Sequence, residues 1–187
     1  LATHQIKLKS IDPMEHLWQD RPPLPQAPAY IYDRKYAGHT CAEKLEALRA
    51  EMRKQGADSL LLSALDEIAW TLNLRGSDVH CNPVVVSYLV IDCQQAHYFI
   101  EPQKLTPEVA EYLKANDVIC HPYESLNEYL SQMTGHLLLA PDKTNYSAYQ
   151  AAARSCHLIE GPSPATLLKA IRNEQEIAGL HAAMERD

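Results

Sequence analysis

The side chains in this sequence that could bind a metal ion or transfer protons include nine histidines, five cysteines and 24 acidic residues. A zinc-type site needs several such ligands close together, often as HxxxH or CxxC, and neither spacing occurs. His80 and Cys81 are adjacent, as are Cys156 and His157. On an extended chain the two members of each pair point in opposite directions. The sequence therefore predicts no metal ligand.

The motifs of common enzyme sites, GxSxG, HExxH, GxGxxG and the Walker loop, are also absent from the sequence. Ser77, Ser87 and Cys81 lie near His80, but no pattern supplies a general base together with a group that orients it. We therefore predict no catalytic residue and no serine or cysteine nucleophile.

The polar loop 77–83 is the stretch best placed to meet a ligand or another domain, because polar side chains gather there between two apolar segments. In one interpretation the loop is structural: Arg75 pairs with Asp78, or Asp78 closes an Asx turn on backbone amides. In the other, Arg75, Asp78 and Asn82 face an adjoining domain or the mouth of its active site. The sequence leaves both interpretations open.

Two apolar segments hold this loop in place. Residues 64–75 carry leucine and isoleucine at helical spacing, with acidic residues in the first turn and Gly76 just past the predicted end. Residues 84–91 form an apolar, β-branched run of strand length. The loop is thus expected between a buried helix and a buried strand.

The rest of the chain alternates predicted helices and strands. Capping patterns at Thr40/Glu43, Thr106-Pro107 and Asn173/Glu176 start helices over 41–55, 106–115 and 173–187. Further helices are expected over 124–133, 145–153 and 165–172, and further strands over 59–63, 96–100, 118–120, 137–140 and 157–160. Residues 84–91 and 96–100 are expected to pair as a hairpin. The pattern predicts an α/β fold, with a mixed β-sheet of about five or six strands flanked by helices.

A Pro-rich connector precedes this fold. Its prolines, which favour a stiff and extended chain, are Pro13, Pro22, Pro23, Pro25 and Pro28. The composition is typical of a linker. Alternatively, Trp18 and Arg21 dock on a neighbouring domain, because an exposed tryptophan needs a surface that buries its ring.

The overall composition is that of an acidic globular protein, with 46% hydrophobic residues, a net charge of −7 and a pI of about 5.7. Binding to nucleic acid would require clustered Lys and Arg, so we expect no nucleic-acid partner. No apolar run approaches the ~20 residues of a membrane span, so we expect no membrane partner. Five cysteines without a CxxC pair favour a reducing compartment and hence a cytoplasmic location.

Three segments carry a resemblance to a known family: ALDEIAWTLNLRGSD followed by NPVVVSYLVI within 64–91, HLWQDRP at 16–22, and AIRNEQEIAGLHAAMERD at 170–187. Together they resemble the middle domain of three-domain Xaa-Pro aminopeptidases (aminopeptidase P, of the creatinase/prolidase group). The resemblance implies a fragment with a linker segment at 1–36, a creatinase N-terminal-like domain at 37–172, and at 173–187 the start of a helix that leads into a missing catalytic domain. The family has a histidine before Asn-Pro, and here that position is Cys81.

The resemblance further implies that the parent protein is a metallopeptidase that removes the N-terminal residue preceding proline. The family uses two divalent metal ions, commonly manganese, held by a catalytic domain of which no ligand is present here, so the fragment alone is expected to be inactive. Its expected role is to shape the cleft and to position its partners, the N-terminal and catalytic domains. Proline-containing peptides and a second copy in a homodimer are expected partners of the parent. The alternative is a metal-free, creatinase-like scaffold or binding module, as in some histone chaperones.

Overall fold

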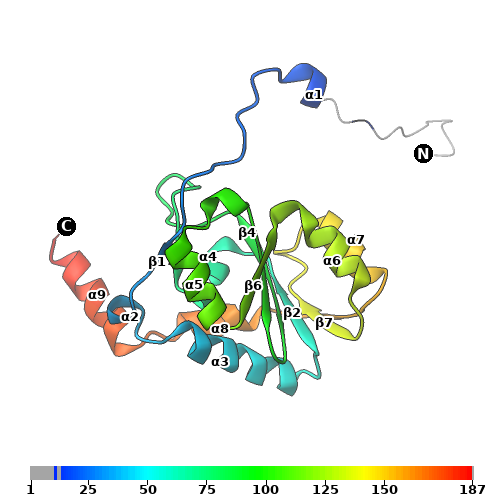
Figure 1. Ribbon diagram of the computed structural model, residues 1–187. Coiled ribbons are helices and arrows are strands. Elements are labelled where there is room, and N and C mark those ends of the chain that lie inside the picture. Colours follow the sequence, from blue (N-terminus) through cyan, green and yellow to red (C-terminus); the bar gives the residue numbers. More distant parts are fainter. Residues whose placement is uncertain (1–10, 12–13, 187) are drawn as a thin grey trace, which may run out of the picture.

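A six-stranded mixed β-sheet forms the centre of the computed structural model, which describes residue 11 and residues 14–186 (Figure 1). The strand order is β6-β5-β4-β2-β7-β8, and the strands are β2 (Ser59–Leu62), β4 (Ser87–Asp92), β5 (Ala96–Ile100), β6 (Val118–Pro122), β7 (His136–Leu139) and β8 (His157–Glu160). β4 pairs antiparallel with β2 and β5, and the other neighbours pair in parallel. The predicted fold class and the β4–β5 hairpin are confirmed.

Helices cover both faces of this sheet, giving three layers. One layer is α3 (Cys41–Lys54), α4 (Leu65–Leu72), α5 (Pro107–Ala115) and α8 (Pro164–Ala170); the other is α6 (Leu126–Gln132) and α7 (Tyr146–Ala153). Successive strand residues serve the two layers in turn, so that Leu60 and Leu62 pack with α3 and α4 while Leu61 packs with α6 and α7. A strand that is buried on both faces reads as a continuous apolar run, as 60–62 does.

Smaller elements surround this core: α1 (Met14–Leu17), β1 (Tyr30–Ile31), α2 (Arg34–Ala37), β3 (Leu74–Arg75), the 3₁₀ turns η2 (Pro102–Lys104) and η3 (Tyr123–Ser125), and α9 (Glu174–Met184). Most of the Pro-rich connector has no regular structure. Residues 1–10, 12–13 and 187 of the predicted linker and last helix lie outside the described residues. Within the described part of the chain, no helix has the length and hydrophobicity needed to span a membrane.

The capping predictions are confirmed at all three helices. Thr40 and Glu43 form a complete capping box at α3, and Asn173 and Glu176 form a second one at α9. The Thr106 side chain accepts a hydrogen bond from the Val109 backbone N–H at 3.2 Å. Such caps are local, which is why sequence spacing finds them.

Two predicted boundaries next to the polar loop are wrong. The helix ends at Leu72 rather than at Arg75-Gly76, because Asn73 adopts a left-handed conformation (φ 51°) and the chain continues into β3, which pairs with β1. The strand begins at Ser87 rather than at Val84, because residues 84–86 bond back to the loop: the Asp78 N–H donates to the Val84 carbonyl, and the Val86 N–H donates to the Asp78 carboxylate.

Candidate functional site

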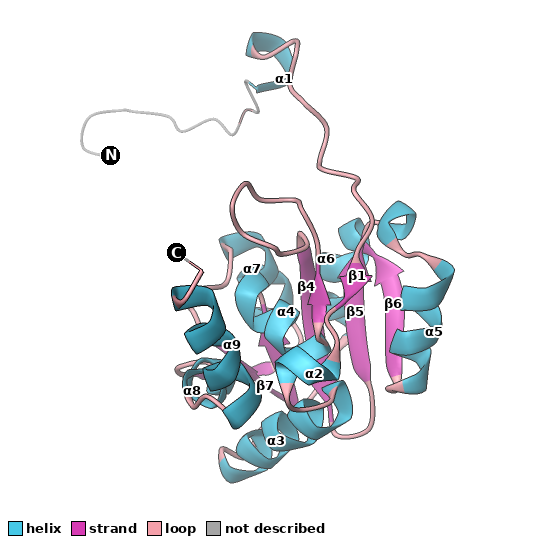
Figure 2. Ribbon diagram, turned by 90° about the vertical axis from the view of Figure 1, so that its left-hand side faces the viewer, coloured by secondary structure: helices cyan, strands magenta, loops and turns pink. Residues whose placement is uncertain are grey.

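A groove of about 820 Å³ lies between α4, the loop that follows it, and α9. Figure 2 shows α2, α8 and α9 gathered on this side of the domain. The groove has aromatic, charged and polar lining residues, among them Tyr32, Tyr36, Trp70, Arg75, Arg172, Arg186, Lys169, Asp66, Glu176 and Asn82. It therefore contains two of the residues that the sequence singled out, Arg75 and Asn82.

Arg75 is held rigidly in the groove wall. Its Nη1 donates hydrogen bonds to the carbonyls of Ala69 (2.6 Å) and Leu74 (2.8 Å), and its guanidinium lies 4.2 Å from the centre of the Tyr32 ring. Burial lowers the pKa of the Arg75 side chain from its usual value. Within the described residues, no carboxylate forms an ion pair with it. Arg75 thus joins β3 to the end of α4 and presents a preorganised cation.

Asp78 is placed elsewhere, in a buried ion pair with Lys104 of η2. Each side chain is 1% exposed, and the same carboxylate oxygen accepts a hydrogen bond from the Val86 N–H at 2.6 Å. The predicted pairing of Asp78 with Arg75 is therefore wrong, and so is a tight Asx turn, since the amide is eight residues away. The role of Asp78 visible here is to close the loop against the domain.

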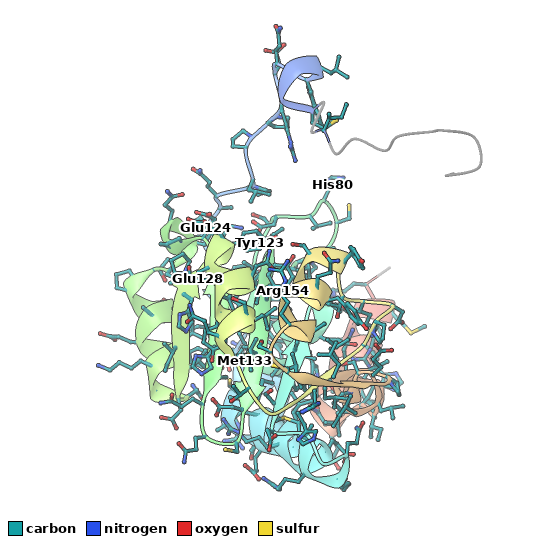
Figure 3. All side chains as sticks on the ribbon, turned by 90° about the vertical axis from the view of Figure 1, so that its right-hand side faces the viewer. His80, Tyr123, Glu124, Glu128, Met133 and Arg154 are labelled. Carbon is teal, nitrogen blue, oxygen red and sulfur yellow. The ribbon has the colours of Figure 1, made fainter. Side chains whose placement is uncertain are left out.

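The other predicted residues lie at the surface. Asn82 is exposed at the groove, and His80 extends from the end of the same loop, away from the body of the domain (Figure 3). Trp18 is 48% exposed, with the Arg21 guanidinium 6.0 Å from its ring centre. Trp18 does not line the groove, so the structure does not bring the four predicted residues into one site.

Helix α9 forms the outer wall of the groove and has no buried residue. Its first turn is fixed to the domain by the Asn173 side chain, which donates to the Ala37 carbonyl at 2.9 Å. Beyond that anchor, Ile177 is 44% exposed, Leu180 52% and Met184 78%. These residues lie at i, i+3 and i+7 and so follow one face of the helix.

Sequence reasoning missed two buried charged residues behind the groove. Lys44 Nζ donates hydrogen bonds to the Trp70 carbonyl (2.9 Å) and to Asn73 Oδ1 (2.7 Å), and these two bonds cap the end of α4. Burial lowers the pKa of Lys44 to about 8. Glu67 accepts hydrogen bonds from Ser163 (2.6 Å) and Thr166 (2.5 Å) and pairs with Lys143, which ties α4 to α8. Neither residue had a local partner in the sequence that could have identified it.

The groove is lined mainly by charged and aromatic side chains. Among the residues the structure describes, no group of three or more His, Cys, Asp or Glu side chains is arranged to hold a metal ion. A histidine pair elsewhere, His97 Nδ1 and His121 Nε2 at 3.1 Å with Asp92 on the far side of His97, belongs to an aromatic cluster of β5, β6 and α6. The groove offers charged groups of both signs, amides and aromatic walls to another surface.

Comparison with known proteins places these features in context. Residues 20–176 match the family model of the Creatinase/Prolidase N-terminal domain. The chain is 37% identical over 182 residues to Xaa-Pro aminopeptidase 1 of Dictyostelium discoideum, covering 95% of this chain and 29% of that protein. It is 30% identical over 214 residues to aminopeptidase P2 of Arabidopsis thaliana, covering 97% of this chain and 30% of that protein.

A solved structure shows the same fold. The X-prolyl aminopeptidase of Caenorhabditis elegans, described as a cytosolic enzyme with a di-nuclear active site, superposes with a TM-score of 0.84 at 28% identity. The match covers 90% of this chain and 29% of that one. The chain thus spans less than a third of the length of these relatives.

Proposed function

Because the chain belongs to the creatinase/prolidase N-terminal domain family, we propose that it is a non-catalytic middle domain of a longer, metal-dependent Xaa-Pro aminopeptidase. Two longer relatives are named Xaa-Pro aminopeptidase 1 and X-prolyl aminopeptidase, and the second is described with a di-nuclear active site. The proposal assigns catalysis to a domain outside this chain that holds two divalent metal ions, manganese by family resemblance. We further propose that the parent is cytoplasmic, that its substrates are proline-containing peptides, and that it forms a homodimer.

The observation that carries this proposal is the exposed apolar face of α9. The helix is anchored at its first turn and then displays Ile177, Leu180 and Met184 to solvent. An exposed row of large apolar side chains on one helix face is typical of a protein–protein contact. We infer that this face packs against the catalytic domain and that α9 sets the position of that domain.

The groove beside α9 supports a second part of the proposal, that the domain shapes the cleft. Arg75 is fixed by two hydrogen bonds and an aromatic ring, and Asn82 lies exposed beside it. A rigid polar group such as Arg75 orients a partner at little entropic cost. Arg75 and Asn82 are proposed to face the adjoining domain, and Trp18 the parent's N-terminal domain. Asp78 acts behind them, by holding the loop.

The experiment compares two isoleucines in the parent enzyme, Ile177→Glu and Ile119→Glu. The two side chains are similarly exposed, 44% and 38%, but Ile119 lies on the edge strand β6, away from α9. The proposal predicts that Ile177→Glu lowers kcat/KM for an Xaa-Pro peptide about tenfold or more, while Ile119→Glu leaves it within about twofold, because a buried charge costs several kcal/mol and a solvated one does not. If the two substitutions change kcat/KM equally, the proposed docking role of α9 is refuted.

A further inference from the structure

Three side chains form a row across three neighbouring strands on one face of the sheet. β2, β7 and β8 run in parallel, and the register places His136 beside His157 and Ser59 beside Leu137. Asp58 precedes Ser59 and is therefore next to His136, to which it is bonded. The row Asp58, His136, His157 crosses the amino ends of the three strands.

The carboxylate fixes the orientation of the central imidazole. Asp58 Oδ2 accepts a hydrogen bond from the His136 backbone N–H at 2.7 Å and lies 3.2 Å from His136 Nδ1. A carboxylate at Nδ1 places the ring proton there and leaves the Nε2 lone pair free for a metal ion.

The second imidazole lies at the separation that a shared metal ion requires. A Zn²⁺ ion at its usual distance from a ring nitrogen is about 3.2 Å from that ring's centre, so two rings on a tetrahedral ion have centres about 5.2 Å apart. The His136 and His157 ring centres are 5.5 Å apart, with ring planes 29° from each other. Both residues are exposed, so a metal ion in solvent can reach both rings.

We propose that His136 and His157 form a surface site for a divalent transition-metal ion of the zinc class, with Asp58 as the positioning residue. Water completes the coordination, because the site has two protein ligands. Imidazole pairs prefer Zn²⁺, Ni²⁺ or Cu²⁺, whereas Mn²⁺ stands at the weak end of the affinity order for nitrogen ligands. The site is independent of the proposed peptidase function, whose metal ions belong to a different domain.

The test follows the imidazole NMR signals of His136 while ZnCl₂ is added to the whole 187-residue chain, so that binding elsewhere is not counted. The proposal predicts a saturable shift in wild type, and an apparent affinity at least tenfold weaker in His157→Ala. Asp58→Asn weakens it by about 10–100-fold, the usual effect of losing a carboxylate that orients a metal-binding histidine. MnCl₂ produces no saturation over the same concentrations.

The matched control is His39→Ala. His39 Nδ1 lies 3.8 Å from the Glu43 carboxylate, so it is an exposed histidine beside an acid, but no second imidazole among the described residues is paired with it. The affinity measured at His136 should not change in this variant. The proposal is overturned if His136 shows no saturable shift with Zn²⁺, if His157→Ala binds as tightly as wild type, or if Mn²⁺ binds as tightly as Zn²⁺.

Discussion

The buried pair of Asp78 and Lys104 should be the most costly polar interaction to break in the polar loop. Replacing Asp78 with asparagine keeps the size of the side chain and an oxygen that can accept from the Val86 N–H. It leaves the Lys104 ammonium, 1% exposed, without its counter-charge. Removing one partner of a buried pair typically costs 3–5 kcal/mol, so we expect Asp78→Asn to lower the free energy of unfolding by roughly 3–5 kcal/mol.

Urea unfolding of the 187-residue chain, followed by circular dichroism, measures this loss. Lys104→Met should cost a similar amount, because it leaves Asp78 charged and buried. The double variant should cost clearly less than the sum of the two, since it removes both charges together. This non-additivity separates a charge effect from a general loss of packing.

The matched control is Asp66→Asn. Asp66 also pairs with a lysine, Lys169, but the two side chains are 52% and 28% exposed. Exposed pairs contribute about 0–1 kcal/mol, so this change should cost less than about 1 kcal/mol. If Asp78→Asn costs no more than Asp66→Asn, or if the effects at Asp78 and Lys104 are additive, the pair does not hold the loop.

Three further predictions concern buried groups and α9. Burial lowers the pKa of Lys44 from 10.5 to about 8, so between these pH values the unfolded chain binds more protons than the folded one. The unfolding free energy of wild type, measured in urea against that of Lys44→Met, should therefore rise by roughly 2 kcal/mol from pH 8 to pH 10.5. Glu67→Gln should lower the unfolding free energy by roughly 1–3 kcal/mol, because the donors that meet Glu67 lose a charged acceptor; a loss below about 0.5 kcal/mol would contradict this. Gly38→Ala should speed amide exchange in α9 but not in the sheet, since Gly38 has φ +73° and an added Cβ would clash with Asn173 Oδ1. Unchanged exchange in α9 would contradict the anchor.

The features that the sequence predicts correctly depend on residues only a few positions apart. The capping boxes at Thr40 and Asn173 need only a hydroxyl or amide and an acid three residues later, so spacing alone finds them. The apolar runs of the central strands likewise identify a sheet buried on both faces.

What the sequence misses depends on contacts between distant segments. The end of α4 at Leu72 rests on Lys44 of α3, which reaches Asn73 across 29 residues. Asp78 finds its counter-charge 26 residues away, on a 3₁₀ turn that no pattern marks. Neither distance is encoded in local spacing, so the loop was identified but its internal pairing was not.

The His136–His157 pair is a second example of a feature that local sequence spacing cannot show. His136 and His157 are far apart in the sequence, and a search for metal-ligand spacing passes over them. The parallel register of β7 and β8 makes them neighbours. A site of this kind can be recognised only after the strand pairing is known.

The central claim is that this chain is an accessory domain of an aminopeptidase, and one assay tests it most directly. Hydrolysis of an Xaa-Pro peptide is measured side by side for the 187-residue chain and for the full-length parent, with and without added Mn²⁺. We predict metal-dependent cleavage by the parent and none by the chain. Cleavage by the 187-residue chain alone would contradict a non-catalytic role. A lack of peptide hydrolysis by the metal-loaded parent would contradict the peptidase assignment and favour a metal-free scaffold.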